Sequence, residues 1–141
     1  ELAWLSSVAV GCLTTAILVV NNVRDASTDV LANKRTLVVR FGRGFGLAEY
    51  HLLLALAYGV PVWVYASGRS GVGSLLPLLS LPLAVDLSRR IRRDTGPALN
   101  GVLAHTARLL LCFGVLLCLG LVLGGAAPSA AAAPRLSLVH G

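Results

Sequence analysis

The sequence predicts an all-α protein that is embedded in a membrane. Of its 141 residues, 56% are hydrophobic and only 13% are charged, whereas an ordinary soluble domain carries about 25% charged residues. The sequence contains four long apolar runs, and each is a candidate transmembrane helix. The formal net charge is +6, but the basic residues lie between the apolar runs. That distribution is typical of membrane loops and argues against a nucleic-acid-binding protein.

The four runs differ in how clearly they predict a helix. Leu2 to Val20 carries no charge and has about the length that crosses a hydrocarbon core. Tyr50 to Ser67 is interrupted by Pro61, which a membrane helix tolerates when neighbouring groups satisfy the freed backbone. The run from about Ser70 to Val85 is weaker, because it is short and contains two prolines. Leu109 to about Ala127 is apolar throughout and contains two consecutive glycines near its end.

With polar flanks included, these runs predict spans over about 2–24, 48–67, 70–88 and 104–127. We expect them to belong to one domain, residues 1–127. The Ala/Pro-rich tail, residues 128–141, has the composition of a poorly ordered segment.

Basic residues alternate between the connections that join the spans. The connection after the second span holds only Arg69, and the segment after the fourth holds only Arg135. By the positive-inside rule, the two basic connections are cytoplasmic and both chain ends are external. We therefore expect a multi-pass protein of the cell (inner) membrane. The two basic connections contain Arg24, Lys34, Arg35, Arg40 and Arg43, and Arg89, Arg90, Arg92 and Arg93.

A polar cluster follows the first run, with no Gly or Pro to end the helix. Asn21, Asp25 and Asp29 are spaced four residues apart, which places three oxygen-bearing side chains along one helix face. Two carboxylates one turn apart repel each other. Mg²⁺ offsets such repulsion, because it prefers carboxylate oxygens as ligands. Substrate phosphates commonly complete its coordination shell.

Cationic side chains accompany these acids. Arg24 is a bidentate phosphate donor, and Lys34 and Arg35 follow on the same connection. Acids and cations together predict a site for a Mg²⁺-bound diphosphate. An alternative interpretation is that Asp25 and Asp29 simply pair with these cations in a solvated loop, and spacing alone does not separate the two.

At this cluster the sequence resembles a known family. The stretch Asn21-Asn22-Val23-Arg24-Asp25 with Asp29, followed by Asn33-Lys34-Arg35-Thr36-Leu37, is similar to the second aspartate-rich motif of the UbiA-type intramembrane prenyltransferases. Within that family it most resembles the bacterial 1,4-dihydroxy-2-naphthoate prenyltransferases of menaquinone synthesis. The resemblance continues in Pro97-Ala98-Leu99-Asn100 and in residues 103–108.

The resemblance implies a bundle of nine transmembrane helices with two aspartate-rich motifs facing each other on the cytoplasmic side. This chain would supply its last four helices, the C-terminal part. The first motif would lie in an N-terminal half that is missing from this sequence, and we expect the fragment to be inactive without it. The family often has Gly where Asn33 stands, and Asn tolerates the left-handed backbone that Gly would supply.

The resemblance also implies roles and substrates. Asp25 and Asp29 would be catalytic and would bind Mg²⁺, while Asn21, Arg24, Lys34 and Arg35 would bind the diphosphate. A polyprenyl group would pass from polyprenyl diphosphate to 1,4-dihydroxy-2-naphthoate, with loss of CO₂ and diphosphate, giving demethylmenaquinone. Transfer to another aromatic acceptor such as 4-hydroxybenzoate remains an alternative, as do a membrane transport module and a non-catalytic assembly half.

Overall fold

Residues 1–124 are described by a computed structural model, and within them every regular element is helical. The all-α prediction is thus confirmed, while the tail at 128–141 and the last residues of the fourth span lie outside the described part. In chain order the elements are α1 (Leu2–Leu31), α2 (Leu37–Phe41), α3 (Arg43–Ala66), η1 (Val72–Ser80), α4 (Leu81–Arg93), η2 (Gly96–Ala98) and α5 (Leu99–Gly124).

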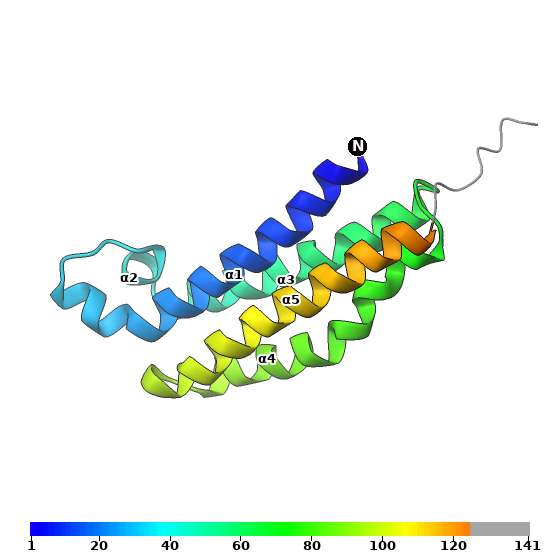
Figure 1. Ribbon diagram of the computed structural model, residues 1–141. Coiled ribbons are helices and arrows are strands. Elements are labelled where there is room, and N and C mark those ends of the chain that lie inside the picture. Colours follow the sequence, from blue (N-terminus) through cyan, green and yellow to red (C-terminus); the bar gives the residue numbers. More distant parts are fainter. Residues whose placement is uncertain (125–141) are drawn as a thin grey trace, which may run out of the picture.

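Four helical stretches are long and apolar enough to cross a membrane, namely Leu2–Leu31, Arg43–Ala66, Val72–Arg93 and Gly96–Gly124. They run side by side in an elongated bundle (Figure 1). In it α1 packs against α3 and α5, and α5 packs against η1 and α4. The beginning of α1 and the end of α5 lie at one end of the bundle, while α2 and η2 lie at the other (Figure 1). The chain is therefore a multi-pass membrane protein.

The helix α1 extends well past its apolar run, because nothing in the polar cluster breaks it. It ends at Leu31, and Asn33 then adopts a left-handed backbone with φ of 55°. The Lys34 amide donates to the Asp29 carbonyl oxygen at 2.9 Å, which closes the turn. This is the left-handed conformation that Asn was expected to tolerate in place of Gly, and it folds the following loop back beside the end of α1.

The third stretch is not one regular α-helix. It begins as the 3₁₀ segment η1, which contains Pro77, and becomes α-helical only at Leu81. Here the backbones of η1 and α5 are in contact. A Cβ added at Gly73 or at Gly120 would collide with backbone atoms of the other segment. Small residues allow such close approach between membrane helices. The tight packing and the proline together favour the narrower 3₁₀ form here.

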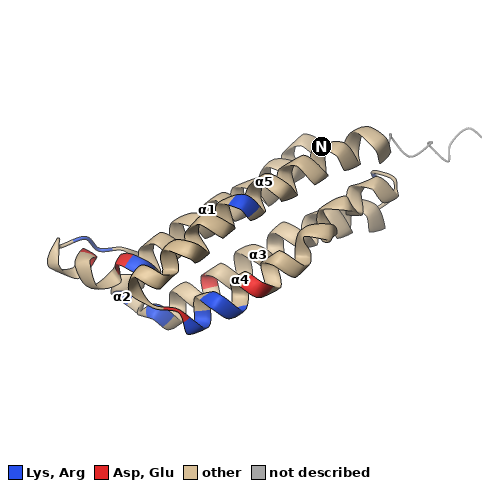
Figure 2. Ribbon diagram, turned by 60° about the horizontal axis from the view of Figure 1, so that its bottom comes forward, with Lys and Arg blue, Asp and Glu red and all other residues tan. Residues whose placement is uncertain are grey.

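The core lies between α1, α3, α4 and α5 and holds few polar groups, and within residues 1–124 no buried polar side-chain atom lacks a hydrogen-bond partner. The Tyr50 hydroxyl lies 3.2 Å from the Thr106 hydroxyl, and the Tyr58 hydroxyl lies 2.7 Å from that of Ser80. Such interhelical hydrogen bonds satisfy hydroxyls that lipid cannot. Most of the Lys and Arg residues gather at the end of the bundle where α2 and the end of α4 lie (Figure 2).

Candidate functional site

The polar cluster at the end of α1 is organised around the guanidinium of Arg24. Its Nε and Nη2 donate to the two carboxylate oxygens of Asp25, each at 2.7 Å. Nη2 also donates to Asn21 Oδ1 at 2.7 Å, one turn back along the same helix. Nη1 donates to Asn100 Oδ1 at 2.9 Å, across to the first turn of α5. Oxygens from two helices thus converge on one cation.

A groove of about 350 Å³ opens beside this cluster. One wall is the end of α1, and the other is η2 with the first turn of α5. Gly96 has a φ of 52°, a left-handed conformation that glycine adopts at no steric cost. That turn directs the chain into Pro97 and α5, and so sets the second wall. The lining residues are Arg24, Asp25, Ser27, Thr28, Gly96, Pro97 and Asn100.

The second predicted acid, Asp29, lies apart from this groove. Its side chain is 7% exposed, and Lys34 Nζ lies 3.2 Å from one of its carboxylate oxygens. The loop that turns at Asn33 brings Lys34 to it. Arg35 is exposed and forms no ion pair among the described residues. Of the predicted residues, Asn21, Arg24 and Asp25 therefore form one cluster, Asp29 and Lys34 form a second, and Arg35 belongs to neither.

Both acids are thus paired with cations, as the alternative interpretation of the sequence required. Asp25 lies beyond the apolar run that ends at Val20, and its side chain is 32% exposed. Hydrogen bonding to the Arg24 guanidinium lowers the pKa of the Asp25 carboxyl below its ordinary value, with the charge of that guanidinium acting in the same direction. The carboxylate therefore stays ionised, and a pair this exposed exchanges its partner at small cost.

The chemistry of the donors fits Mg²⁺. No cluster of three or more His, Cys, Asp or Glu side chains occurs within residues 1–124. Mg²⁺ does not need one, because it is usually held by one or two carboxylates and completed by water and substrate phosphates. The oxygens of Asn21, Asp25 and Asn100 already surround one cationic group, so these surroundings favour positive charge.

Five residues that line the groove were not among the predicted site residues, and two of them, Ser27 and Thr28, lie on α1. Gly96, Pro97 and Asn100 line it from η2 and α5. Pro97 and Asn100 belong to the second stretch that resembles the family, which was the one available signal. The contact between Arg24 and Asn100 joins residues 76 positions apart, and no helical spacing predicts such a pair.

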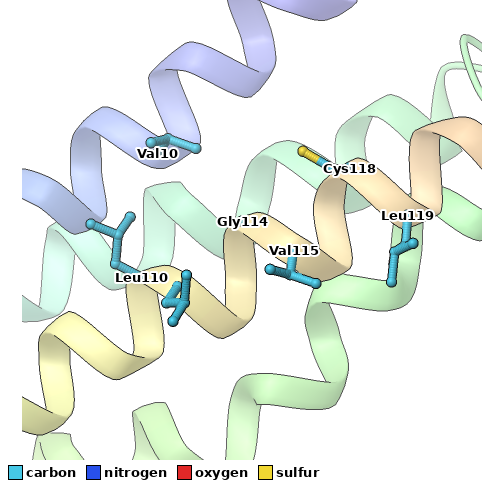
Figure 3. A pocket seen from close by; sticks show the side chains of 7 residues that line it. Val10, Leu110, Gly114, Val115, Cys118 and Leu119 are labelled. Carbon is cyan, nitrogen blue, oxygen red and sulfur yellow. The ribbon is translucent and has the colours of Figure 1, made fainter.

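A separate apolar groove lies between α1 and α5. It measures about 480 Å³ and has Val10 on one side and residues of α5 on the other. Figure 3 shows Val10 and Leu110 facing each other across it, with Cys118 and Leu119 further along α5. Along α1, Val10 precedes Asp25 by roughly 22 Å, from a rise of about 1.5 Å per residue. The same two helices thus carry a polar groove at one level and an apolar groove at another.

Comparison with known proteins gives matches over most of the chain. A model described as the UbiA prenyltransferase family matches residues 1–104. The UbiA prenyltransferase domain-containing protein 1 of Xenopus tropicalis is 34% identical over 122 residues, covering 86% of this chain and 34% of that protein. The 1,4-dihydroxy-2-naphthoate octaprenyltransferase of Mycobacterium leprae (strain TN) is 34% identical over 122 residues, covering 84% of this chain and 40% of that protein.

A second protein of that name, from Escherichia coli (strain K12), is 33% identical over 121 residues, covering 84% of this chain and 39% of that protein. The chain therefore spans between 34% and 40% of the length of these curated relatives. No solved structure matches.

Proposed function

The chain belongs to the UbiA prenyltransferase family, and from this premise we propose that it forms the diphosphate-binding wall of a Mg²⁺-dependent polyprenyltransferase. The observation that carries the proposal is the convergence of Asn21, Asp25 and Asn100 on Arg24 beside an open groove. The activity is that of the full-length protein bearing these residues. Residues 1–127 form the C-terminal part of its domain, and an Asp-rich motif on an earlier helix supplies the opposite wall.

Binding of the diphosphate depends on the fixed cations. Asn21 and Asn100 hold the Arg24 guanidinium at the groove, and the two donors that it gives to Asp25 would become free for the diphosphate when that carboxylate binds the metal. Lys34 and Arg35 approach the same leaving group from the loop after α1. Charge-assisted hydrogen bonds to phosphate are strong and directional, and they strengthen further as negative charge grows on the departing diphosphate.

The two acids would hold the metal. Asp25 offers a carboxylate at the groove, and Asp29, one turn further along α1, would offer another after leaving its present partner Lys34 and turning toward the groove. When bound, Mg²⁺ neutralises diphosphate charge and so eases the break of the carbon–oxygen bond. Lys34 is the present partner of Asp29 and is largely exposed, which leaves it free to move to the diphosphate.

The apolar groove between α1 and α5 would bind the isoprenoid chain of the polyprenyl diphosphate. Its lining is apolar from Val10 to Leu119, which suits an isoprenoid chain whose diphosphate is held at Arg24. Exclusion of water protects the allylic cation until the aromatic ring attacks. The attacked ring carbon then forms the new carbon–carbon bond.

We assign 1,4-dihydroxy-2-naphthoate as the acceptor. Support comes from the Asn-Asn-x-Arg-Asp and Lys-Arg-Thr-Leu stretches, and from the two bacterial relatives whose names carry that substrate. Carboxylate loss as CO₂ from the attacked carbon, together with departure of diphosphate, gives a prenylated naphthoquinol, which is the reduced form of demethylmenaquinone. The site faces the cytoplasmic side of the inner membrane, as the distribution of basic residues predicts.

The test uses membranes that hold the full-length protein, supplied with Mg²⁺, a polyprenyl diphosphate and an equimolar mixture of 1,4-dihydroxy-2-naphthoate and 4-hydroxybenzoate. We expect a prenylated, decarboxylated naphthoquinol, identified by mass spectrometry, as the main product. Prenylated 4-hydroxybenzoate as the main product would overturn the acceptor assignment. Absence of any prenylated product would overturn the proposed function itself.

A further inference from the structure

A third groove lies along η1 and α4. It measures about 490 Å³ and shares no residue with the groove beside Arg24. Leu81 and Val85 are 42% and 41% exposed there, so no described segment covers them. The lining residues recur every three or four positions, as on one face of a helix. They are Leu78, Leu81, Pro82, Val85, Asp86 and Arg89.

The groove is apolar along most of its length and ends at a cation. Asp86 is the single acid that lines it, and Arg90 neutralises this acid through a 2.7 Å ion pair. Arg89 is exposed and has no ion-pair partner among the described residues. Arg92 and Arg93 follow one turn later and bind His51 and Asp94. The positive charge beside the groove is therefore left for an external anion.

The length of the groove matches one leaflet of a bilayer. From Leu78 to Arg89 the axis advances roughly 18 Å, by the rises of 3₁₀- and α-helices. Half of a hydrocarbon core about 30 Å thick is about 15 Å. An acyl chain that lies along Leu78, Leu81 and Val85 thus ends where Arg89 would meet a headgroup phosphate. If the basic residues served only to orient the protein in the membrane, no apolar groove would need to end at Arg89.

We propose that this groove binds one anionic phospholipid, with an acyl chain against the apolar face of η1 and α4 and the headgroup phosphate at Arg89. Figure 2 shows the basic end of α4 at the same end of the bundle as the basic end of α1. The lipid would therefore sit in the leaflet nearest the candidate site, without contacting that site. The inference stands on the α4 face alone and does not depend on the proposed enzymatic function.

The experiment is native mass spectrometry of the purified full-length protein in a neutral detergent. The protein is delipidated and then titrated with phosphatidylglycerol or phosphatidylcholine of identical acyl chains. We expect one retained phosphatidylglycerol per protein and weaker binding of phosphatidylcholine. Arg89→Gln should lower the affinity for phosphatidylglycerol about fivefold, the effect of one basic side chain near an anionic membrane surface. It should weaken phosphatidylcholine binding less, because choline offsets the charge of that phosphate.

Two further variants make the test specific. Val85→Trp fills the groove from an exposed position, and it should reduce phosphatidylglycerol binding although Arg89 is retained. Arg40→Gln removes the same charge from an exposed position on α2 and should leave phosphatidylglycerol binding unchanged. Thermal unfolding of each variant in detergent confirms that it is folded.

Three outcomes would overturn the proposal. Equal binding of the two lipids would show that Arg89 does not select an anion. Equal losses in Arg89→Gln and Arg40→Gln would show that net charge, and not the groove, attracts the lipid. Absence of a retained lipid in the wild-type protein would show that the groove is filled by protein or is not a lipid site.

Discussion

The contact between Asn100 and Arg24 offers a direct test of how the groove is built, because within residues 1–124 no other hydrogen bond joins α5 to the guanidinium. Replacing Asn100 with Ala removes the 2.9 Å acceptor of Arg24 Nη1 and leaves the bonds to Asn21 and Asp25 in place. A hydrogen bond to a charged group contributes about 1.5–3 kcal/mol. Asn100 is exposed, so solvent reduces this to about 1 kcal/mol or slightly more. A loss of that size corresponds to about a fivefold fall in the rate constant kcat/KM.

The assay measures kcat/KM for the polyprenyl diphosphate in membranes holding the full-length protein. The matched control is Ser27→Ala, which lines the same groove but whose side chain forms no hydrogen bond with Arg24 among the described residues. We expect kcat/KM to fall about fivefold for Asn100→Ala and to stay within about twofold for the control. An Asn100→Ala protein with wild-type kcat/KM would refute the claim that α5 orients Arg24. An equal fall in kcat/KM in both variants would show that the effect is not specific to the hydrogen bond between Asn100 and Arg24.

Three further changes test how the fold supports the site. Lys34→Met should leave the buried Asp29 carboxylate without its cation and so lower the free energy of unfolding. The expected loss is only about 1 kcal/mol, because the lysine is largely exposed. An unchanged denaturation midpoint would contradict this. Arg43→Met removes donors to three carbonyls at the end of α4, so we expect faster amide hydrogen exchange over residues 91–98, and wild-type exchange there would disprove the role. Gly120→Ala should lower the melting temperature, because its Cβ meets the backbone of η1, whereas Gly114→Ala, which faces open space, should not.

The sequence was sufficient for the fold class and for most of the local structure. A bilayer fixes the length of an apolar run that can cross it, so composition alone predicted the spanning helices. The polar cluster contains no residue that ends a helix, and α1 accordingly continues through it to Leu31. The left-handed backbone at Asn33 agrees with the expectation that Asn tolerates this conformation where the family often has Gly.

The arrangement around the acids was not predictable from spacing. Helical periodicity places Asp25 and Asp29 on one face, but it does not say what packs against each of them. The loop after α1 covers Asp29 and supplies Lys34, whereas η2 and α5 leave Asp25 beside an open groove. The 3₁₀ form of η1 likewise depends on backbone contact with Gly120, which is 47 residues from Gly73 in the chain. No local pattern encodes these tertiary contacts, although Pro77 within η1 is a local feature that also favours the 3₁₀ form.

The central claim is that Asp25 holds a metal-bound diphosphate at the end of α1. The measurement that tests it most directly is the rate of prenyl transfer by membranes holding the full-length protein, as a function of Mg²⁺ concentration, for the wild type and for Asp25→Asn. We predict saturable Mg²⁺ dependence in the wild type and loss of turnover in the variant, because the amide offers a neutral oxygen where the metal needs a charged one. Near wild-type turnover of Asp25→Asn at limiting Mg²⁺ would contradict the claim.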